Sequence, residues 1–259
     1  MWRKDGLCRI QAELGHDALC ETCREFPRLR HDFGDFIELG LELSCPEAAR
    51  LILAHSCHNW VKHTPSDGGE YDKQAMDTLL RSRKEFLVFL DNTNLSFPQI
   101  LTALLLYGYD VQEELDGGVF AELNPERYLK DGYKLPGKGD FAALQEFFLG
   151  LEILTPRWKE QLKTPWVIPQ WDKRHKALLG YFICRYWLQA VSDYDLLCRI
   201  KFMIAACLLI GALGGEPIET AQLFSKEIEN DPDNVEAILD GAYTAPALTD
   251  LHLLRLLRD

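Results

Sequence analysis

Cysteines near the start of the chain are the residues whose types and spacing point most directly to chemistry. Four of the eight cysteines lie within the first 45 residues, namely Cys8, Cys20, Cys23 and Cys45. Cys20 and Cys23 form a C-x2-C pair, a spacing that lets two sulfurs reach one metal ion across a turn. The whole spacing, C-x11-C-x2-C-x21-C, fits a four-sulfur zinc site or part of an iron–sulfur site. The sequence therefore predicts a metal site here, with buried cysteines that act only as small apolar residues as the alternative.

The other cysteines and the histidines give weaker signals. The remaining cysteines are isolated on apolar stretches, where core packing is the expected role: Cys57, Cys184, Cys198 and Cys207. His55 and His58 are three residues apart and would share one helix face, with His63 further on. One such pair without a nearby carboxylate favours an ordinary helix surface over a metal site.

Aromatic and acidic residues of the second half also have structural interpretations. Four aromatic residues at helical spacing indicate core packing rather than a pocket: Tyr181, Phe182, Tyr186 and Trp187. Four carboxylates are expected to cap helices or face solvent: Asp193, Asp195, Glu227 and Glu229. No Gly-rich phosphate loop, Ser-His-Asp spacing or HExxH motif occurs, and the sequence assigns no catalytic base.

Composition excludes several classes of protein. The formal net charge of -12 argues against nucleic-acid binding, which needs concentrated Lys and Arg. The longest apolar run, from Phe202 to Leu213, is too short for a bilayer span of about 20 residues. The polar start of the chain, from Met1 to Gly6, lacks the apolar region of a secretory signal. We therefore expect a cytoplasmic protein with no membrane partner and with thiols rather than disulfides.

The elements that must position these residues are mostly helices. Ile37 to Leu43 alternates apolar and polar residues and predicts a half-buried strand, the only clear strand signal. Ser44 is expected to cap a helix that runs to about Val61 and places Cys45 in its first turn, where the helix dipole favours a thiolate. Another helix is predicted from Ser96 to about Gly108. The fold class is mostly α, with a Cys-rich metal-binding unit at 1–63 and an α-helical domain at 74–259.

Several segments together resemble the flagellin lysine-N-methylase family, part of a wider group with a Cys-rich zinc- or iron-chelating domain. The most specific are Thr22-Cys23-Arg24-Glu25-Phe26-Pro27-Arg28 and Ser44-Cys45-Pro46-Glu47-Ala48-Ala49-Arg50, with further likeness from Gly6 to Gln11 and from Tyr181 to Leu188. The resemblance implies S-adenosylmethionine-dependent methylation of lysine side chains of flagellin by a protein that carries an iron–sulfur cluster. Cys8, Cys23 and Cys45 match cysteines of the family, whereas Cys20 is an additional one.

The chain departs from this family at its start. Members carry a further Cys-rich segment before the position at which Met1-Trp2-Arg3-Lys4 begins here. We therefore expect an N-terminally shortened member whose metal site is incomplete. Two other interpretations stay open: a non-catalytic helical interaction protein with structural zinc, and an inactive remnant without metal. The sequence does not predict the oligomeric state.

Overall fold

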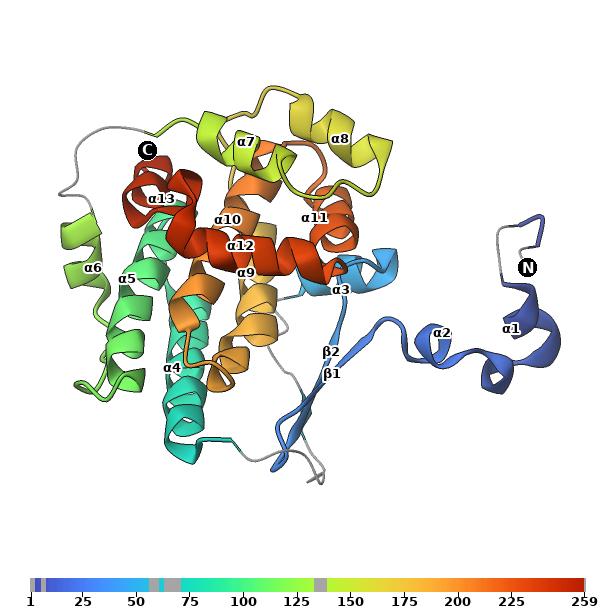
Figure 1. Ribbon diagram of the computed structural model, residues 1–259, viewed down its shortest axis with the longest axis horizontal. Helices are drawn as coiled ribbons and strands as arrows, with labels where there is room; N and C mark the ends of the chain where they lie inside the picture. The colour runs from blue at the N-terminus through green and yellow to red at the C-terminus, as the bar shows by residue number, and fades with distance from the viewer. Residues whose placement is uncertain (1–2, 6–7, 56–60, 63–70, 133–138, 259) are drawn as a thin grey trace.

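A computed structural model of the chain describes residues 3–5, 8–55, 61–62, 71–132 and 139–258. Most of these residues are helical, which confirms the predicted mostly α class. Figure 1 shows a compact helical body and an N-terminal arm that extends away from it. Within the described ranges, every helix is too short or too polar to span a membrane.

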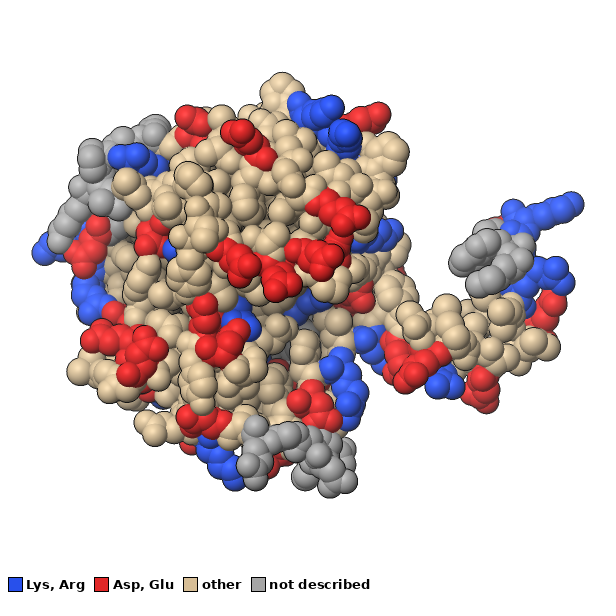
Figure 2. Space-filling model, in the orientation of Figure 1, with Lys and Arg blue, Asp and Glu red and all other residues tan. Residues whose placement is uncertain are grey.

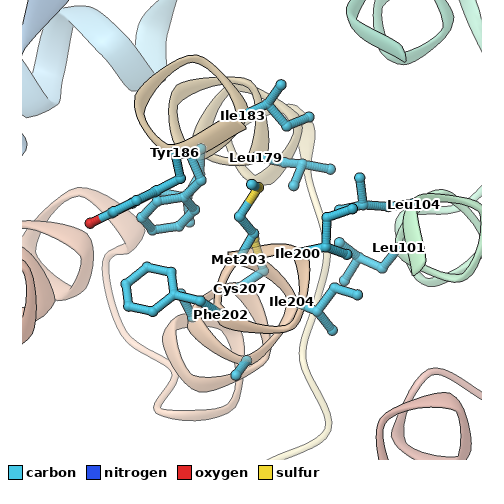
Figure 3. Close-up of a cluster of buried hydrophobic side chains, with 14 of the residues drawn as sticks. Leu101, Leu104, Leu179, Ile183, Tyr186, Ile200, Phe202, Met203, Ile204 and Cys207 are labelled. Carbon is cyan, nitrogen blue, oxygen red and sulfur yellow. The ribbon is translucent and has the colours of Figure 1, made fainter. Parts of the chain in front are cut away.

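The core of the body lies between four helices: α4 (Lys73–Asn92), α5 (Phe97–Leu115), α9 (Lys173–Tyr186) and α10 (Leu196–Ala212). All residues of α10 are buried, so this helix is surrounded by the others. Figure 3 shows side chains from three of the helices pointing toward one another, including Leu101, Leu104, Leu179, Ile183, Ile200 and Met203. Burial of each such side chain contributes roughly 1.5–3 kcal/mol to stability.

Helix α5 continues past the position at which the sequence predicted its end. A Cβ atom on Gly108 would lie 2.3 Å from Ile200 Cδ1, so glycine permits the close approach of α5 and α10. The prediction was wrong because this glycine serves packing between helices rather than helix termination. The start of α5 was predicted correctly, since the backbone N–H of Ser96 donates to Gln99 Oε1 at 2.9 Å.

Shorter helices complete the body: α6 (Pro125–Gly132), α7 (Ala142–Leu149), α8 (Pro156–Lys163), α11 (Pro217–Phe224), α12 (Pro232–Thr244) and α13 (Asp250–Leu256). One turn of π-helix, Ser225–Glu229, follows α11, and 3-10 helices lie at Trp187–Val191 and Pro246–Leu248. Figure 2 shows acidic side chains along α12, where Asp233, Glu236 and Asp240 are exposed.

The arm consists of α1 (Arg9–Leu14), a 3-10 helix at His16–Ala18 and α2 (Glu21–Glu25). None of these helices has a buried residue. A small antiparallel sheet with the order β1-β2-β3 joins the arm to the body: β1 (Arg28–Asp32), β2 (Ile37–Leu41) and β3 (Val61–Lys62). The register pairs Arg28 with Leu41 and Asp32 with Ile37.

The predicted strand is confirmed as β2, which is followed by α3 (Pro46–Ala54). Two details of the prediction were wrong. Cys45 rather than Ser44 is the N-cap, because Pro46 occupies the first helical position. The helix ends at Ala54, where His55 is extended, and Val61–Lys62 pairs with β2 instead of continuing the helix.

The proposed boundary between residues 63 and 74 falls largely outside the described residues, and the division into two units stays a prediction. Phe36, Leu43 and Leu53 belong to the same buried cluster as the body helices. Gln222 of α11 also donates to the carbonyl of Ser44 at 2.9 Å. The later part of the 1–63 unit is therefore packed on the body, and only the arm extends from it (Figure 1).

Candidate functional site

The four N-terminal cysteines are free thiols, and three of them precede a helix. Cys8, Cys20 and Cys45 are the N-caps of α1, α2 and α3, and none of their side chains caps the helix by a hydrogen bond. Cys20 and Cys23 are exposed, whereas Cys8 and Cys45 are half-buried. Their sulfurs are therefore available to an external ligand rather than engaged in core packing.

Cys20 and Cys23 lie together across the first turn of α2. The backbone N–H and then the thiol of Cys23 hydrogen-bond to Cys20 and lower the pKa of Cys20. The same thiol contact, followed by the charge of Cys20, raises the pKa of Cys23. A smaller contribution from Cys8 also raises the pKa of Cys23. Loss of one proton from the pair therefore gives a thiolate centred on Cys20, the form of sulfur that binds metal.

Strands β1 and β2 form a hairpin, and Cys45 follows it on the side of the body. The open end of the hairpin brings its two flanking segments together, since the N–H of Glu42 donates to the carbonyl of Pro27 at 2.9 Å. Cys23 lies four residues before Pro27, and Cys45 lies three residues after Glu42. The sequence-distant cysteines thus flank one end of the same hairpin.

The structure does not assemble all the predicted ligands. In the described part of the chain, no three residues among His, Cys, Asp and Glu are arranged to hold a metal ion. The donor chemistry of the Cys20–Cys23 pair fits a thiophilic metal, with two sulfurs together. The ligand set of Cys8, Cys20, Cys23 and Cys45 stays a prediction.

The other candidate metal residues separate into buried and undescribed ones. Cys184, Cys198 and Cys207 are buried, as predicted, and burial raises the pKa of the Cys184 and Cys198 thiols to about 12. Cys57, His58 and His63 lie outside the described residues. His55 is an exposed residue at the end of α3.

A second group of polar residues, which we call the Glu229 cluster, lies buried between α9 and the π-helical turn. It consists of Glu229, Arg185, Tyr181 and Tyr186. Arg185 Nη1 is 3.4 Å from Glu229 Oε1, and their side chains are 10% and 0% exposed. The hydroxyl of Tyr186 donates to Glu229 Oε1 at 2.9 Å, and that of Tyr181 lies 3.2 Å from Oε2. Both oxygens of the carboxylate are therefore bound within the protein.

Electrostatics in the Glu229 cluster favours the ion pair. Burial opposes the charged form of Arg185, but the negative charge of Glu229 together with the contributions of Tyr181 and Tyr186 outweighs it and raises the pKa of Arg185 well above its usual value. Burial, and then the adjacent carboxylate, also raises the pKa of Tyr186. Arg185 therefore stays charged, and the tyrosines stay neutral, beside the Glu229 carboxylate.

The sequence-based interpretation of Glu227 and Glu229 as solvent-facing was wrong, because the whole residues, backbone included, are only 1% and 7% exposed. Glu227 accepts hydrogen bonds from the N–H of Leu154 at 2.9 Å and from the N–H and hydroxyl of Thr155. The π-helical turn brings both carboxylates inward, and α-helical periodicity does not predict this. The prediction that these carboxylates cap helices is confirmed for Asp195, which is the N-cap of α10. Asp193 forms an ion pair with Arg199 at 2.8 Å.

A further buried ion pair, between Arg83 and Glu38, fixes the β1–β2 hairpin to the body. Arg83 of α4 forms two hydrogen bonds with Glu38 of β2, at 2.9 and 2.5 Å, and both side chains are nearly buried. His31 of β1 lies in the same region, where burial and then the charge of Arg185 lower its pKa. The base of the arm is therefore held in one position, although the arm itself is exposed.

Comparison with known proteins finds short similarities to a flagellar biosynthetic protein and to two lysine-N-methylases. The chain is 44% identical over 50 residues to the flagellar biosynthetic protein FliU of Salmonella muenchen. It has the same identity over 50 residues to the lysine-N-methylases of Salmonella typhimurium (strain LT2) and Salmonella choleraesuis (strain SC-B67). No family model and no solved structure matches the chain.

These similarities cover a small part of each protein. The matched residues make up 19% of this chain, 30% of FliU and 12% of each lysine-N-methylase. They support a partial resemblance to lysine-N-methylases, in agreement with the resemblance found in the sequence.

Proposed function

We propose that this protein acts as a flagellin lysine-N-methylase, which transfers a methyl group from S-adenosylmethionine to lysine side chains of flagellin. The observation that carries the proposal is the 44% identity over 50 residues with two lysine-N-methylases. The similarity to a flagellar biosynthetic protein supports flagellin as the substrate.

The reaction places clear demands on the protein. A lysine ε-ammonium must lose a proton so that its nitrogen lone pair can attack carbon. S-adenosylmethionine supplies a methyl group on a positively charged sulfur. The new N–C bond forms as the S–C bond breaks, and that bonding pair leaves with sulfur as a neutral thioether. The methylated nitrogen then releases its remaining extra proton to solvent or to a base.

The buried carboxylates are poor candidates for that base. Both oxygens of Glu229 already bind tyrosine or arginine, and both oxygens of Glu227 bind the segment before α8. We therefore assign them to the stability of the body. The base stays unassigned.

The proposal includes an iron–sulfur cluster held by the four N-terminal cysteines, with zinc as the alternative metal. Cys8, Cys23 and Cys45 match the cysteines of the resembled family, and Cys20 adds a fourth sulfur. The exposed thiols and the Cys20–Cys23 contact support such a role. A cytoplasmic location also belongs to the proposal, because free thiols are maintained there.

Metal content tests the cofactor part of the proposal. We expect anaerobically purified protein to contain iron with sulfide, or zinc, and to lose it in Cys23→Ser and Cys45→Ser. Cys184→Ser is the matched control, since Cys184 is buried away from the arm and should not affect metal content. Unchanged metal content in both Cys23→Ser and Cys45→Ser would contradict the ligand assignment.

Methyl transfer tests the enzymatic part. Incubation of metal-loaded protein with flagellin and methyl-labelled S-adenosylmethionine should place label on lysine. A protein that retains metal but transfers no label would instead favour the non-catalytic interaction protein with structural zinc.

A further inference from the structure

A hollow of about 730 Å³ lies outside the cysteine arm and the Glu229 cluster. It is formed by the end of β1, the start of α4 and the turn between the 3-10 helix Trp187–Val191 and α10. We call it the aromatic cleft, and its principal lining residues are Asp32, Phe33, Tyr71, Asp72, Tyr194 and Arg199. Its volume is in the range of small-molecule and cofactor sites in proteins, about 300–1,000 Å³.

Three aromatic rings line this cleft and come from three separate segments. The hydroxyl of Tyr71 donates to Asp35 at 2.9 Å, and the hydroxyl of Tyr194 donates to Asp72 at 3.3 Å. Phe33 packs against Phe36, with ring centroids 5.1 Å apart. The two tyrosine rings are thus fixed at their hydroxyl ends, whereas the ring of Phe33 also stacks on His31, with centroids 6.4 Å apart. The faces of aromatic rings carry the negative part of the quadrupole and attract cations.

Tyr194 has a left-handed backbone conformation, with φ of 59°. Such a conformation is uncommon for a bulky residue and costs of order 1 kcal/mol or more. It is held by a hydrogen bond from the Tyr194 N–H to the carbonyl of Ala190 at 2.8 Å. The body therefore supports a strained turn that leaves the Tyr194 side chain 44% exposed at the cleft.

The charges around the cleft are predominantly negative. Asp72 accepts hydrogen bonds from Gln74 N, Ala75 N and Tyr194, but no cation pairs with it among the residues that the structure describes. Asp32 pairs with Arg30 at 2.8 Å in a largely exposed ion pair, which is worth little. Arg199 is neutralised by Asp193, which binds both its terminal nitrogens at 2.9 and 2.8 Å.

One buried donor at the cleft wall lacks a partner. Arg199 is 5% exposed, and its Nε has no hydrogen-bond partner among the described residues. That nitrogen has no accessible surface, so Arg199 contributes to the wall of the cleft and offers no donor to its interior.

We propose that the aromatic cleft binds an organic cation, a positively charged nitrogen or sulfur carried on carbon chains. Rings of Phe33, Tyr71 and Tyr194 receive the cation, and Asp72 supplies the unpaired negative charge. Two sources share this chemistry: a lysine or methyllysine side chain of a polypeptide, and a sulfonium compound. The choice of these two sources rests on the proposed function, whereas the inference itself concerns binding at the cleft and not methyl transfer.

Calorimetric titration of the full chain tests this site with charged and neutral probes of matched shape. For the lysine source, binding of acetyl-trimethyllysine amide is compared with binding of an analogue in which carbon replaces the charged nitrogen. For the sulfonium source, binding of S-adenosylmethionine is compared with binding of S-adenosylhomocysteine, whose sulfur carries no positive charge. We expect at least one charged probe to bind more tightly than its neutral counterpart. The pair of probes that shows this difference identifies the source.

Variants then locate the binding. Asp72→Asn and Tyr194→Ala should each weaken binding of the charged probe roughly three- to thirtyfold, the range of a cation–aromatic or charge contact. Asparagine is also a good N-cap, so Asp72→Asn retains the start of α4. Asp231→Asn is the matched control, because Asp231 is the N-cap of α12, away from the cleft, and binding should not change.

The inference would be overturned if neither charged probe bound more tightly than its neutral counterpart, or if both cleft variants bound like the unchanged protein. Cation binding that depends on Asp72 without any methyl transfer to flagellin would leave the cleft established and contradict only the proposed function.

Discussion

The cysteine arm and the Glu229 cluster are two polar regions with opposite physical character. In the arm, α1 and α2 bury no residue, and the Cys20 and Cys23 thiols are exposed. In the Glu229 cluster, the carboxylate is fully buried and its oxygens bind Arg185, Tyr181 and Tyr186. The cluster has its partners within the protein, whereas the arm exposes its Cys20 and Cys23 thiols.

Because of this difference, we expect the Glu229 cluster to contribute to stability and the arm to contribute to ligand binding. A buried, hydrogen-bonded ion pair is costly to disrupt, because removal of one partner leaves an uncompensated charge. Exposed thiols contribute little to the stability of the body, and binding of a ligand would add its free energy to the folded arm. Variants in the cluster should therefore change stability, and variants in the arm should change metal binding and thiol chemistry.

The largest expected effect on stability is that of Glu229→Ala. It leaves Arg185 buried without its carboxylate, and we expect a loss of about 3–5 kcal/mol in the free energy of unfolding. Urea unfolding followed by circular dichroism measures it. Glu236→Ala, at an exposed site on α12, is the control and should stay within about 0.5 kcal/mol of the unchanged protein. Similar stability of the two variants would break the contrast.

Arg83→Ala should have the next largest effect, about 3 kcal/mol, because Glu38 then remains buried and unpaired. Hydrogen exchange should also show faster exchange in β2. The control is Arg30→Ala, whose exposed pair with Asp32 is worth less than about 1 kcal/mol. If Arg83→Ala were as mild as Arg30→Ala, the hairpin would not depend on the buried pair.

Cys23→Ser in metal-free, reduced protein should hardly change stability, within about 0.5 kcal/mol. Its side chain is exposed on a helix with no buried residue. The same unfolding measurement applies, with Cys207→Ser as a buried comparison that should be clearly less stable. A strongly destabilised, metal-free Cys23→Ser protein would show that the arm takes part in the core after all.

The smallest expected effect is a pKa change at Cys20. The N–H and thiol of Cys23 lower the pKa of Cys20, so its thiolate forms at a lower pH than in an ordinary cysteine. Cys23→Ala removes the thiol contact, and the pKa of Cys20 should rise. The midpoint of iodoacetamide alkylation at Cys20, followed by mass spectrometry, should therefore move to higher pH. Cys45→Ala should leave the midpoint unchanged, and an unchanged or lower midpoint in Cys23→Ala would refute the contact.

Sequence patterns predicted the helices and β2 well, because apolar periodicity over many residues determines both. They missed β1, whose residues Arg28-Leu29-Arg30-His31-Asp32 are mostly polar and are held by pairing with β2. They also missed the burial of Glu229, because a π-helical turn changes the helical phase at Ser225–Glu229.

The candidate sites differ in the same way. The C-x2-C spacing predicted that Cys20 and Cys23 lie together, since three residues span one helical turn. The distance in sequence from Cys23 to Cys45 gave no such prediction, and only the hairpin shows that they flank the same end. The aromatic cleft had no sequence signal, because its three rings come from separate segments and Tyr194 depends on an unusual backbone angle.

Methylation of flagellin lysines tests the central proposal most directly. Purified flagellin would be incubated with S-adenosylmethionine and metal-loaded protein, and its lysines examined by mass spectrometry. We predict methylated lysines with the unchanged protein and with Cys184→Ser, and a strong loss with Cys23→Ser. Flagellin that remains unmethylated by metal-loaded, folded protein would contradict the proposed function.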